Sequence, residues 1–252
     1  MPQHRSVRAA LTALVLVAGL SVVPFGTTTP ALADTSAPRG NIGAFKQDFV
    51  QDFRTNATAG GQFAKTYANS WQPYPDGMSG MYYSGRQISA HAGFMDVVLD
   101  GKHGAAGTFG TPTGAWDRRG GKFSIRARAL GGDGNGAAFM LWPTSNVWTE
   151  GEIDYPEANF EDAPMSHQHS MKKGKEVTAT SASTNGSWRS WHVYSIEWIP
   201  GKYVRYLFDN RVISTVRWDV PKTSHRYMFQ VGNWGKAGHL EIDWVTTYRY
   251  TG

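Results

Sequence analysis

The stretch WHVYSIEWIPGKYVRYLFDNRVISTVRW, residues 191–218, indicates the fold class. Its apolar and aromatic side chains form short runs, which Pro200-Gly201 and Asp209-Asn210 separate. Proline, glycine, aspartate and asparagine favour tight turns, and short apolar runs between such turns are typical of antiparallel strands. The stretch therefore predicts a meander of neighbouring strands.

A second stretch, GKFSIRARAL at residues 121–130, alternates apolar and polar side chains. Successive side chains of a strand point to opposite faces, so its apolar set should share one buried face. That set is Phe123, Ile125, Ala127 and Ala129. The run AAFMLWP at 137–143 is more uniformly apolar, which predicts a strand buried on both faces.

Several further runs resemble strands, and no segment shows a convincing helical period. These runs are MYYSGRQISA (81–90), GFMDVVLDG (93–101), RYMFQVGNW (226–234) and HLEIDWVTTYRY (239–250). We expect the first two of them to pair as neighbouring strands. No linker, repeat or low-complexity block divides them. The pattern predicts an all-β domain in which two large antiparallel sheets stack as a sandwich with a concave cleft.

The N-terminus has the three parts of a secretory signal. MPQHRSVR is basic, AALTALVLVAGLSVV is apolar, and Ala31 and Ala33 form an A-x-A cleavage pattern. We expect residues 1–33 to be removed, 34–45 to form a flexible lead, and 46–252 to form a single β-sandwich domain. The protein would then be extracellular, without stable membrane association; an uncleaved anchor is the alternative.

The composition of the chain limits which classes of partner it can bind and how it can be stabilised. The chain of 252 residues has no cysteine, so an exported form must rely on its core rather than on disulfides. Its net charge of +5 includes two arginines of the signal, and its basic residues are scattered apart from KKGK at 172–175. This pattern does not indicate a nucleic-acid partner. Aromatic residues make up 13% of the chain, which suits stacking on flat ligands.

An acidic stretch, WTEGEIDYPEANF at 148–160, carries Glu152, Asp154 and Glu157. In a regular strand the first two share a face and the third points the opposite way. One extra residue in a bulge would reverse that parity, and Pro156 is tolerated at a bulge. The stretch therefore predicts three carboxylates on one face.

Three carboxylates on one face repel one another unless a metal, a cation or a functional proton compensates. Cleavage of a glycosidic bond needs such a pair: one carboxylate attacks the anomeric carbon, and the other donates a proton to the leaving oxygen. The alternative is a solvated acidic face. EIDW at 241–244 is an internal control, because it repeats the first two acids without a third and fits an ordinary closing strand.

The sequence GEIDYPEAN resembles the active-site signature of glycoside hydrolase family 16, in the bulged form E-x-D-x-x-E of its laminarinase-like and agarase-like members. Four other segments resemble family strands in the expected order, over about residues 45–250. They are GGKFSIRAR, AAFMLWP, WHVYSIEWIPGKYVRYLFDN and IDWVTTYRY. The resemblance implies a β-jelly-roll, with Glu152 as nucleophile, Glu157 as general acid/base and Asp154 modulating their protonation. It also implies retention at the anomeric centre.

The resemblance extends to substrate-binding residues. Trp148 matches a tryptophan near the cleavage point and is expected to stack on a sugar, with a place in the core as the alternative. Trp142 fits either role. Gln230 and Trp234 resemble cleft residues of a late strand, whereas Met140 departs from the tryptophan that many relatives carry near that position.

His167 and His169 share a face if their strand is regular. Relatives carry one histidine there, near the acid/base, and His169 is the better match; a surface histidine is the alternative, and no full zinc ligand set is present. Asp243 matches an aspartate that binds structural calcium in many relatives. No cofactor is required for the reaction, and a structural calcium ion is the one metal that the resemblance raises.

Together these features predict a secreted, retaining endo-hydrolase of a β-linked polysaccharide, acting as a monomer. The bulged motif favours β-1,3-glucan or mixed-linkage β-glucan. Galactans such as agar remain an alternative substrate, and transglycosylation an alternative reaction. A non-catalytic polysaccharide-binding module is the alternative from another class, although such relatives typically lack the glutamates present at 152 and 157.

Overall fold

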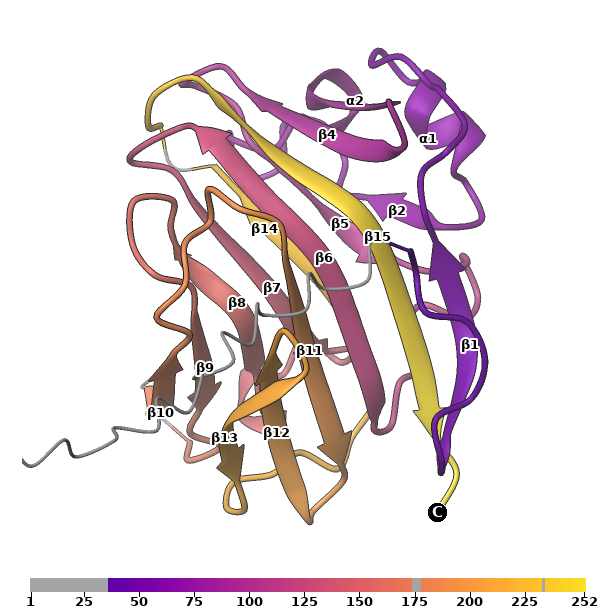
Figure 1. Cartoon of the computed structure of the whole chain (residues 1–252), viewed down its shortest axis with the longest axis vertical. Helices are drawn as coiled ribbons and strands as arrows, with labels where there is room; N and C mark the ends of the chain where they lie inside the picture. Colours follow the sequence, from indigo (N-terminus) through magenta and orange to yellow (C-terminus); the bar gives the residue numbers. More distant parts are fainter. Residues whose placement is uncertain (1–35, 174–177, 233) are drawn as a thin grey trace, which may run out of the picture. The chain divides into compact units, whose positions relative to one another are not determined.

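The structure, a computed structural model, describes residues 36–173, 178–232 and 234–252 (Figure 1). The expected signal at 1–33 and part of the KKGK cluster lie outside the described residues. Within the described part, no helix is both long and apolar enough to cross a membrane. Residues 36–44, expected as a flexible lead, contact the domain through Ala37, which packs against Val193 and Trp244.

One antiparallel sheet has eight strands. In spatial order they are β13 (Arg211–Val216), β12 (Tyr203–Phe208), β11 (His192–Ile199), β6 (Gly121–Gly131), β15 (Gly238–Tyr250), β4 (Phe94–Leu99) and β3 (Ile88–His91), with β1 (Phe45–Gln51) also paired to β15. Strands distant in sequence, such as β6 and β15, are neighbours in this sheet (Figure 1). Non-local pairing of this kind fits the expected jelly-roll.

The other antiparallel sheet has seven strands. In spatial order they are β10 (Thr178–Ser183), β9 (Met165–His169), β8 (Ile153–Asn159), β7 (Gly136–Pro143), β14 (His225–Val231), β5 (Ala105–Phe109) and β2 (Trp71–Pro73). The described helical segments are short: α1 (Gln62–Thr66), α2 (Ser84–Gln87) and the 3-10 turn η1 (Trp148–Glu150). The predicted all-β sandwich of two antiparallel sheets is confirmed.

The predicted meander is also present, because β11, β12 and β13 are consecutive neighbours. Asp209 and Asn210 have φ angles of 46° and 63°, the left-handed values that a two-residue hairpin turn requires. The Asp209 carboxylate accepts the backbone N–H of Val193 at 2.9 Å and lies 2.8 Å from Nδ1 of His192. This turn is therefore tied to the start of β11.

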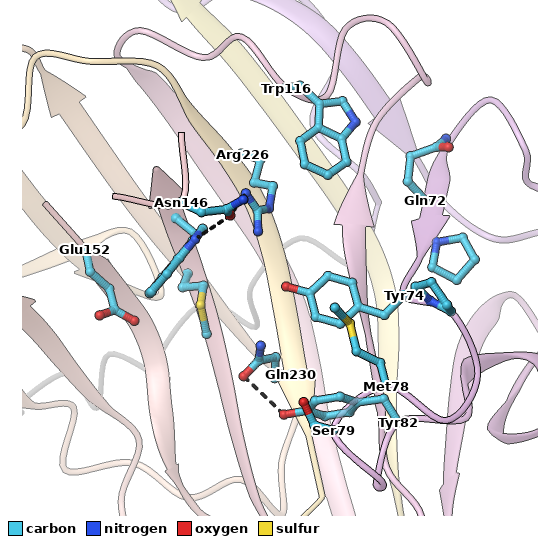
Figure 2. A pocket seen from close by; sticks show the side chains of 14 residues that line it. Gln72, Tyr74, Met78, Ser79, Tyr82, Trp116, Asn146, Glu152, Arg226 and Gln230 are labelled. Atoms are coloured by element: carbon cyan, nitrogen blue, oxygen red, sulfur yellow. Dashed lines mark hydrogen bonds between the residues drawn. The ribbon is translucent and has the colours of Figure 1, made fainter. Parts of the chain in front are cut away.

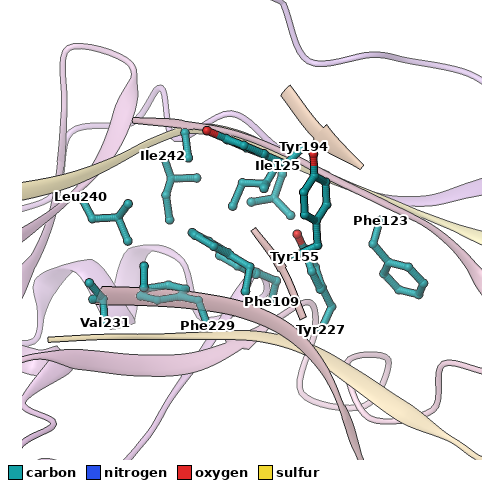
Figure 3. Packing of buried hydrophobic residues seen from close by; sticks show 14 of the residues in the cluster. Phe109, Phe123, Ile125, Tyr155, Tyr194, Tyr227, Phe229, Val231, Leu240 and Ile242 are labelled. Carbon is teal, nitrogen blue, oxygen red and sulfur yellow. The ribbon is translucent and has the colours of Figure 1, made fainter. Parts of the chain in front are cut away.

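The inner faces of the two sheets form one hydrophobic cluster. On β6 the predicted inward set from Phe123 to Ala129 is fully buried. Opposite it, Phe229 of β14 is fully buried and stacks on Trp71 with ring centroids 5.1 Å apart. Figure 3 shows residues of both sheets, such as Phe229 and Ile242, facing one another across this core.

The prediction for residues 81–90 was partly wrong. Only Ile88–His91 forms a strand, which pairs with β4 as expected, while Ser84–Gln87 forms helix α2. Two buried polar side chains hold this turn: Ser84 Oγ donates to the carbonyl of Ala106 at 2.8 Å, and Gln87 Nε2 donates to that of Val98 at 2.7 Å. These tertiary hydrogen bonds satisfy groups that a continued strand would leave facing the core.

Candidate active site

The acidic strand β8 contains the bulge that its sequence predicts. Asp154 pairs with Met140 of β7 and Glu157 pairs with Ala138, so three steps on β8 oppose two on β7. The extra residue brings Asp154 and Glu157 to the same face. The Tyr155–Pro156 peptide within the bulge is cis.

Glu152 lies immediately before β8, where two aromatic residues surround its carboxylate. The indole N–H of Trp148 donates to Glu152 Oε2 at 2.6 Å, and His169 Nε2 lies 3.9 Å from the same oxygen. The rings of Trp148 and His169 meet edge to face, with centroids 5.8 Å apart. Trp148 sits in η1 rather than on the catalytic strand, and its described contact orients Glu152.

Asp154 is the most buried of the three acids, at 2% exposed. Its Oδ2 lies 2.8 Å from Nε2 of His169. Burial raises the pKa of Asp154 well above its usual range; the charges of Glu152 and Glu157 raise it further, while His169 opposes the shift. Asp154 therefore holds a proton more readily than an ordinary aspartate.

The two histidines of β9 are in different electrostatic environments. Burial lowers the pKa of His169, but its hydrogen bond to Asp154 and the neighbouring carboxylates outweigh burial, so the pKa lies above its ordinary value. Burial also lowers the pKa of His167, and here the charge of Glu157, 3.8 Å away, does not compensate. His169 therefore interacts mainly with Glu152 and Asp154, whereas His167 interacts mainly with Glu157.

Two adjoining clefts lie on the outer face of the seven-stranded sheet. Glu152 lines the larger, of about 770 Å³, and Glu157 lines the smaller, of about 390 Å³. Tyr82 and Gln230 line both clefts and are hydrogen-bonded to each other at 3.2 Å (Figure 2). Each glutamate therefore borders a cleft, and the two clefts meet at Tyr82 and Gln230.

The predicted binding residues divide between cleft and surroundings. Trp142 lines the larger cleft, His167 the smaller, and Gln230 both. Trp148 and His169 lie behind the clefts, against Glu152. Trp234 is 62% exposed and does not line either cleft.

Strand β7 corrects one prediction. Its run AAFMLWP was expected to be buried on both faces, but Met140 and Trp142 line the larger cleft, and Trp142 is half-buried. The apolar character of the outward face therefore reflects the cleft floor rather than a second packed layer. A sugar-binding cleft and a buried face both require apolar side chains, so hydrophobicity alone did not separate them.

Several cleft residues were not anticipated from the sequence. Arg226 lies on β14 four residues before Gln230, and strand alternation places both side chains on one face. Their even spacing was therefore a sequence signal that could have identified Arg226. Tyr74 and Tyr82 come from the segment between β2 and α2, and Trp116 comes from the loop between β5 and β6. No periodic pattern marks loop residues for a shared cleft.

The surroundings of Asp243 do not fit a calcium site. Its carboxylate pairs with the guanidinium of Arg126, and the adjacent Glu241 pairs with Arg128 at 2.5 Å. Burial raises the pKa of Asp243, and Arg126 opposes that shift. Calcium requires six to eight oxygen ligands, whereas here a fixed cation already occupies the carboxylate. The second EID thus forms ion pairs on the outer face of β15.

Among the described residues, one set of three side chains has ligand atoms close enough to share a metal ion: Glu152, Asp154 and His169, all within 4.8 Å of one another. These atoms already interact through the contacts of Trp148 and His169 described above. Asp243 belongs to no such set in that part of the chain.

A sandwich with paired glutamates bordering an open cleft is the architecture of a glycoside hydrolase. The model of the glycosyl hydrolases family 16 matches residues 84–246, and the chain belongs to this family. The expected family is thereby confirmed, and the enzyme class is glycoside hydrolase. A search of curated protein sequences found no match.

Solved structures share the fold at low sequence identity. SCLam, a non-specific endo-β-1,3(4)-glucanase, is 18% identical, with a TM-score of 0.67 over 85% of this chain and 94% of its own. The laminarinase from Rhodothermus marinus is 20% identical, with a TM-score of 0.64 over 82% and 98%. The laminarinase catalytic domain from Thermotoga maritima MSB8 is 17% identical, with a TM-score of 0.62 over 81% and 98%.

Proposed function

We propose that the protein is a secreted, retaining endo-hydrolase of a β-linked polysaccharide. Glu152 is the nucleophile, Glu157 the general acid/base, and Asp154 the buried acid that modulates their protonation. One observation carries this proposal: the β8 bulge puts Asp154 and Glu157 on one face, and Glu152 and Glu157 border adjoining clefts.

The reaction would proceed in two steps. Glu152 attacks the anomeric carbon while Glu157 donates its proton to the leaving glycosidic oxygen, which breaks the bond and leaves a glycosyl-enzyme ester. Glu157 then removes a proton from water, and that water releases the sugar with its configuration retained. The hydrogen bond from Trp148 holds Oε2 of Glu152 and so orients the attacking carboxylate.

The order of the two glutamates sets the direction of the bound polysaccharide. The attacked ring lies next to Glu152, and the leaving sugar lies beyond the bond that Glu157 protonates. The larger cleft, which Glu152 lines, would hold the glycone side, and the smaller cleft the aglycone side. Room on both sides of the bond supports endo action.

The substrate and location are inferred from the similar structures and from the N-terminal sequence. Relatives described as laminarinases and endo-β-1,3(4)-glucanases favour β-1,3-glucan or mixed-linkage β-glucan, with galactans such as agar as the alternative. Transglycosylation would use the same acids and differ only in whether water or a sugar accepts the intermediate. The presence of both glutamates disfavours a pure binding module. The signal-like N-terminus supports secretion, and we expect a monomer.

The test is release of reducing sugar by residues 34–252 from laminarin, curdlan, lichenan, agarose, carrageenan and xyloglucan. We expect oligosaccharides of mixed length, with the anomeric configuration retained in early products followed by NMR. Glu152→Gln and Glu157→Gln should each reduce turnover by about 10³-fold or more. Glu150→Gln, a neighbouring glutamate of η1, is the matched control. Near-wild-type activity in either active-site variant would contradict the proposal.

A further inference from the structure

Arg226 is a buried cation in the wall of the larger cleft. It lies on β14, is 6% exposed, and shares the cleft with Trp116, Trp142 and Glu152. Figure 2 shows Arg226 beside Asn146, with Trp116 on one side of the cleft and Glu152 on the other. The mechanism proposed above does not use this residue.

The guanidinium group is held in place by its neighbours. Its Nη1 donates to the carbonyl of Pro143 at 3.2 Å and to Oδ1 of Asn146 at 3.0 Å. Its Cζ lies 4.9 Å from the ring centroid of Trp116. Its Nε is buried and has no hydrogen-bond partner among the described residues. Nη1 is therefore fixed, and Nη2 is the donor that remains for a ligand in the cleft.

Among the described residues, Arg226 forms no ion pair, in contrast to other arginines that are largely removed from solvent. Arg118, which is equally buried, pairs with Asp48; Arg126 and Arg128 pair with the acids of β15. The hydrogen-bond partners of Arg226 among the described residues are neutral, the Pro143 carbonyl and the Asn146 amide oxygen, although Glu152 lines the same cleft. A buried charge without a counterion is costly, and a bound anion would offset that cost.

We propose that Arg226 binds an anionic substituent, a carboxylate or a sulfate ester, on a sugar of the glycone side, so that the enzyme prefers acidic forms of its β-linked polysaccharide. The assignment to the glycone side rests on the proposed function. A guanidinium N–H forms strong, charge-assisted hydrogen bonds with carboxylate and sulfate oxygens, and the fixed orientation of Arg226 reduces the entropy lost on binding. Trp116 and Trp142 supply apolar faces for the sugar rings around it.

Binding can be measured without turnover in a Glu157→Gln background by calorimetry. The probes are laminarihexaose, its C6-oxidised carboxylate form and its sulfated form, together with neutral agarose and sulfated κ-carrageenan oligosaccharides. We expect one anionic form to bind about 10- to 100-fold more tightly than its neutral counterpart, the range for hydrogen bonds to a charged group. That advantage should shrink between 50 and 500 mM NaCl. The two anionic forms distinguish carboxylate from sulfate.

Arg226→Gln in the same background should abolish the anionic advantage and leave binding of the neutral probe within about twofold. Arg211→Gln, an exposed arginine of β13, removes the same charge outside the cleft and should retain the advantage. If Arg226→Gln does not fold, as judged by its Tm, Arg226→Lys is the second variant. It keeps the positive charge but removes the planar guanidinium group. That variant should keep only part of the advantage and all of its salt dependence.

Equal binding of neutral and anionic probes, or an equal loss of both in Arg226→Gln, would overturn this inference. So would an anionic advantage that does not respond to salt. Turnover separates the inference from the proposed function. Cleavage of neutral polymers without anionic preference overturns the inference alone, whereas tight anionic binding without release from any polymer, acidic ones included, overturns only the proposed function.

Discussion

Asp154 is a carboxylic acid almost completely removed from water, at 2% exposed, between two other acids. The burial that raises its pKa would normally destabilise the fold, and the contact with His169 at 2.8 Å offsets part of that cost. Such an arrangement is typical of active sites, where titratable groups are held at unusual pKa values. The residue is therefore better explained by the reaction than by stability.

Replacing Asp154 with asparagine should separate these two roles. Asp154→Asn preserves the size of the side chain but removes its titration, so we expect kcat to fall by about 10²-fold, the lower end of the effect of proton-transfer groups. The Tm should change by only a few degrees, because the variant no longer buries a carboxylate. Steady-state kinetics and calorimetry test this; a collapse of Tm with kcat preserved would assign Asp154 to structure.

His169 gives a pH-dependent prediction. Its pKa is raised in the folded state, so its contribution to stability is fully present below the unfolded value of about 6.5 and is lost as pH rises through the folded value. We expect His169→Gln to lower the free energy of unfolding by about 1–3 kcal/mol near pH 6, and by less near pH 9. Urea unfolding across this range measures the difference; a loss that grows with pH would contradict it.

At the residue scale, the sequence identified the three acids because a bulged carboxylate motif is specific. It did not identify Arg226, whose described partners are neutral groups, or the contact of Trp148 with the carboxylate of Glu152. The roles of Arg226 and Trp148 depend on their neighbours in space rather than on their residue types.

Among the elements, the hairpin between β12 and β13 is the one whose turn can be tested directly. Burial raises the pKa of Asp209, but hydrogen bonds from His192 and the Val193 N–H outweigh it, so the pKa lies below its ordinary value. Stability from this group is therefore present above about pH 4 and is lost as pH falls through the folded value.

We expect Asp209→Ala to lower the free energy of unfolding by about 1–3 kcal/mol at pH 7 and by less at pH 3. Asp209→Asn is the matched control, because its amide oxygen can still accept the Val193 N–H and asparagine tolerates the positive φ of 46°. Urea unfolding at both pH values gives the comparison. An equal loss of unfolding free energy in the two variants would show that the negative charge of Asp209 stabilises the turn. Neither the positive φ nor the hydrogen bond accepted from the Val193 N–H would then account for its effect.

Element prediction succeeded where local signals agree. Turn residues and side-chain alternation located the meander and β6, because the local preference for strand conformation and the pattern of buried side chains agree there. Residues 84–87 differ because their hydrogen bonds reach Ala106 and Val98, on other strands. A local window contains neither partner, so it cannot reveal the helix.

At the scale of the whole domain, the two sheets share one hydrophobic cluster. Phe229 packs in it against Trp71, Phe109 and Phe139, with ring centroids 5.1–5.6 Å apart. A single continuous core should unfold in one cooperative transition, observed alike by fluorescence and far-UV circular dichroism.

Phe229→Ala should therefore cost about 3–5 kcal/mol of unfolding free energy, because it leaves a cavity between the sheets. Val212→Ala, at a position 53% exposed on the edge strand β13, should change it by no more than about 0.5 kcal/mol. Denaturant unfolding of both variants makes the comparison. Similar small losses would mean that the core relaxes around the missing ring.

Turn chemistry and a period of two residues were enough to predict the all-β class, the meander, the inward face of β6 and the bulged acidic strand. The surroundings of these elements became visible only in the folded protein. The tertiary structure brought loop aromatics and Arg226 into the cleft of Glu152, paired Asp243 with Arg126, and buried Asp154 against His169. Such contacts join residues far apart in the chain, and their burial and charge exist only once the two sheets have packed.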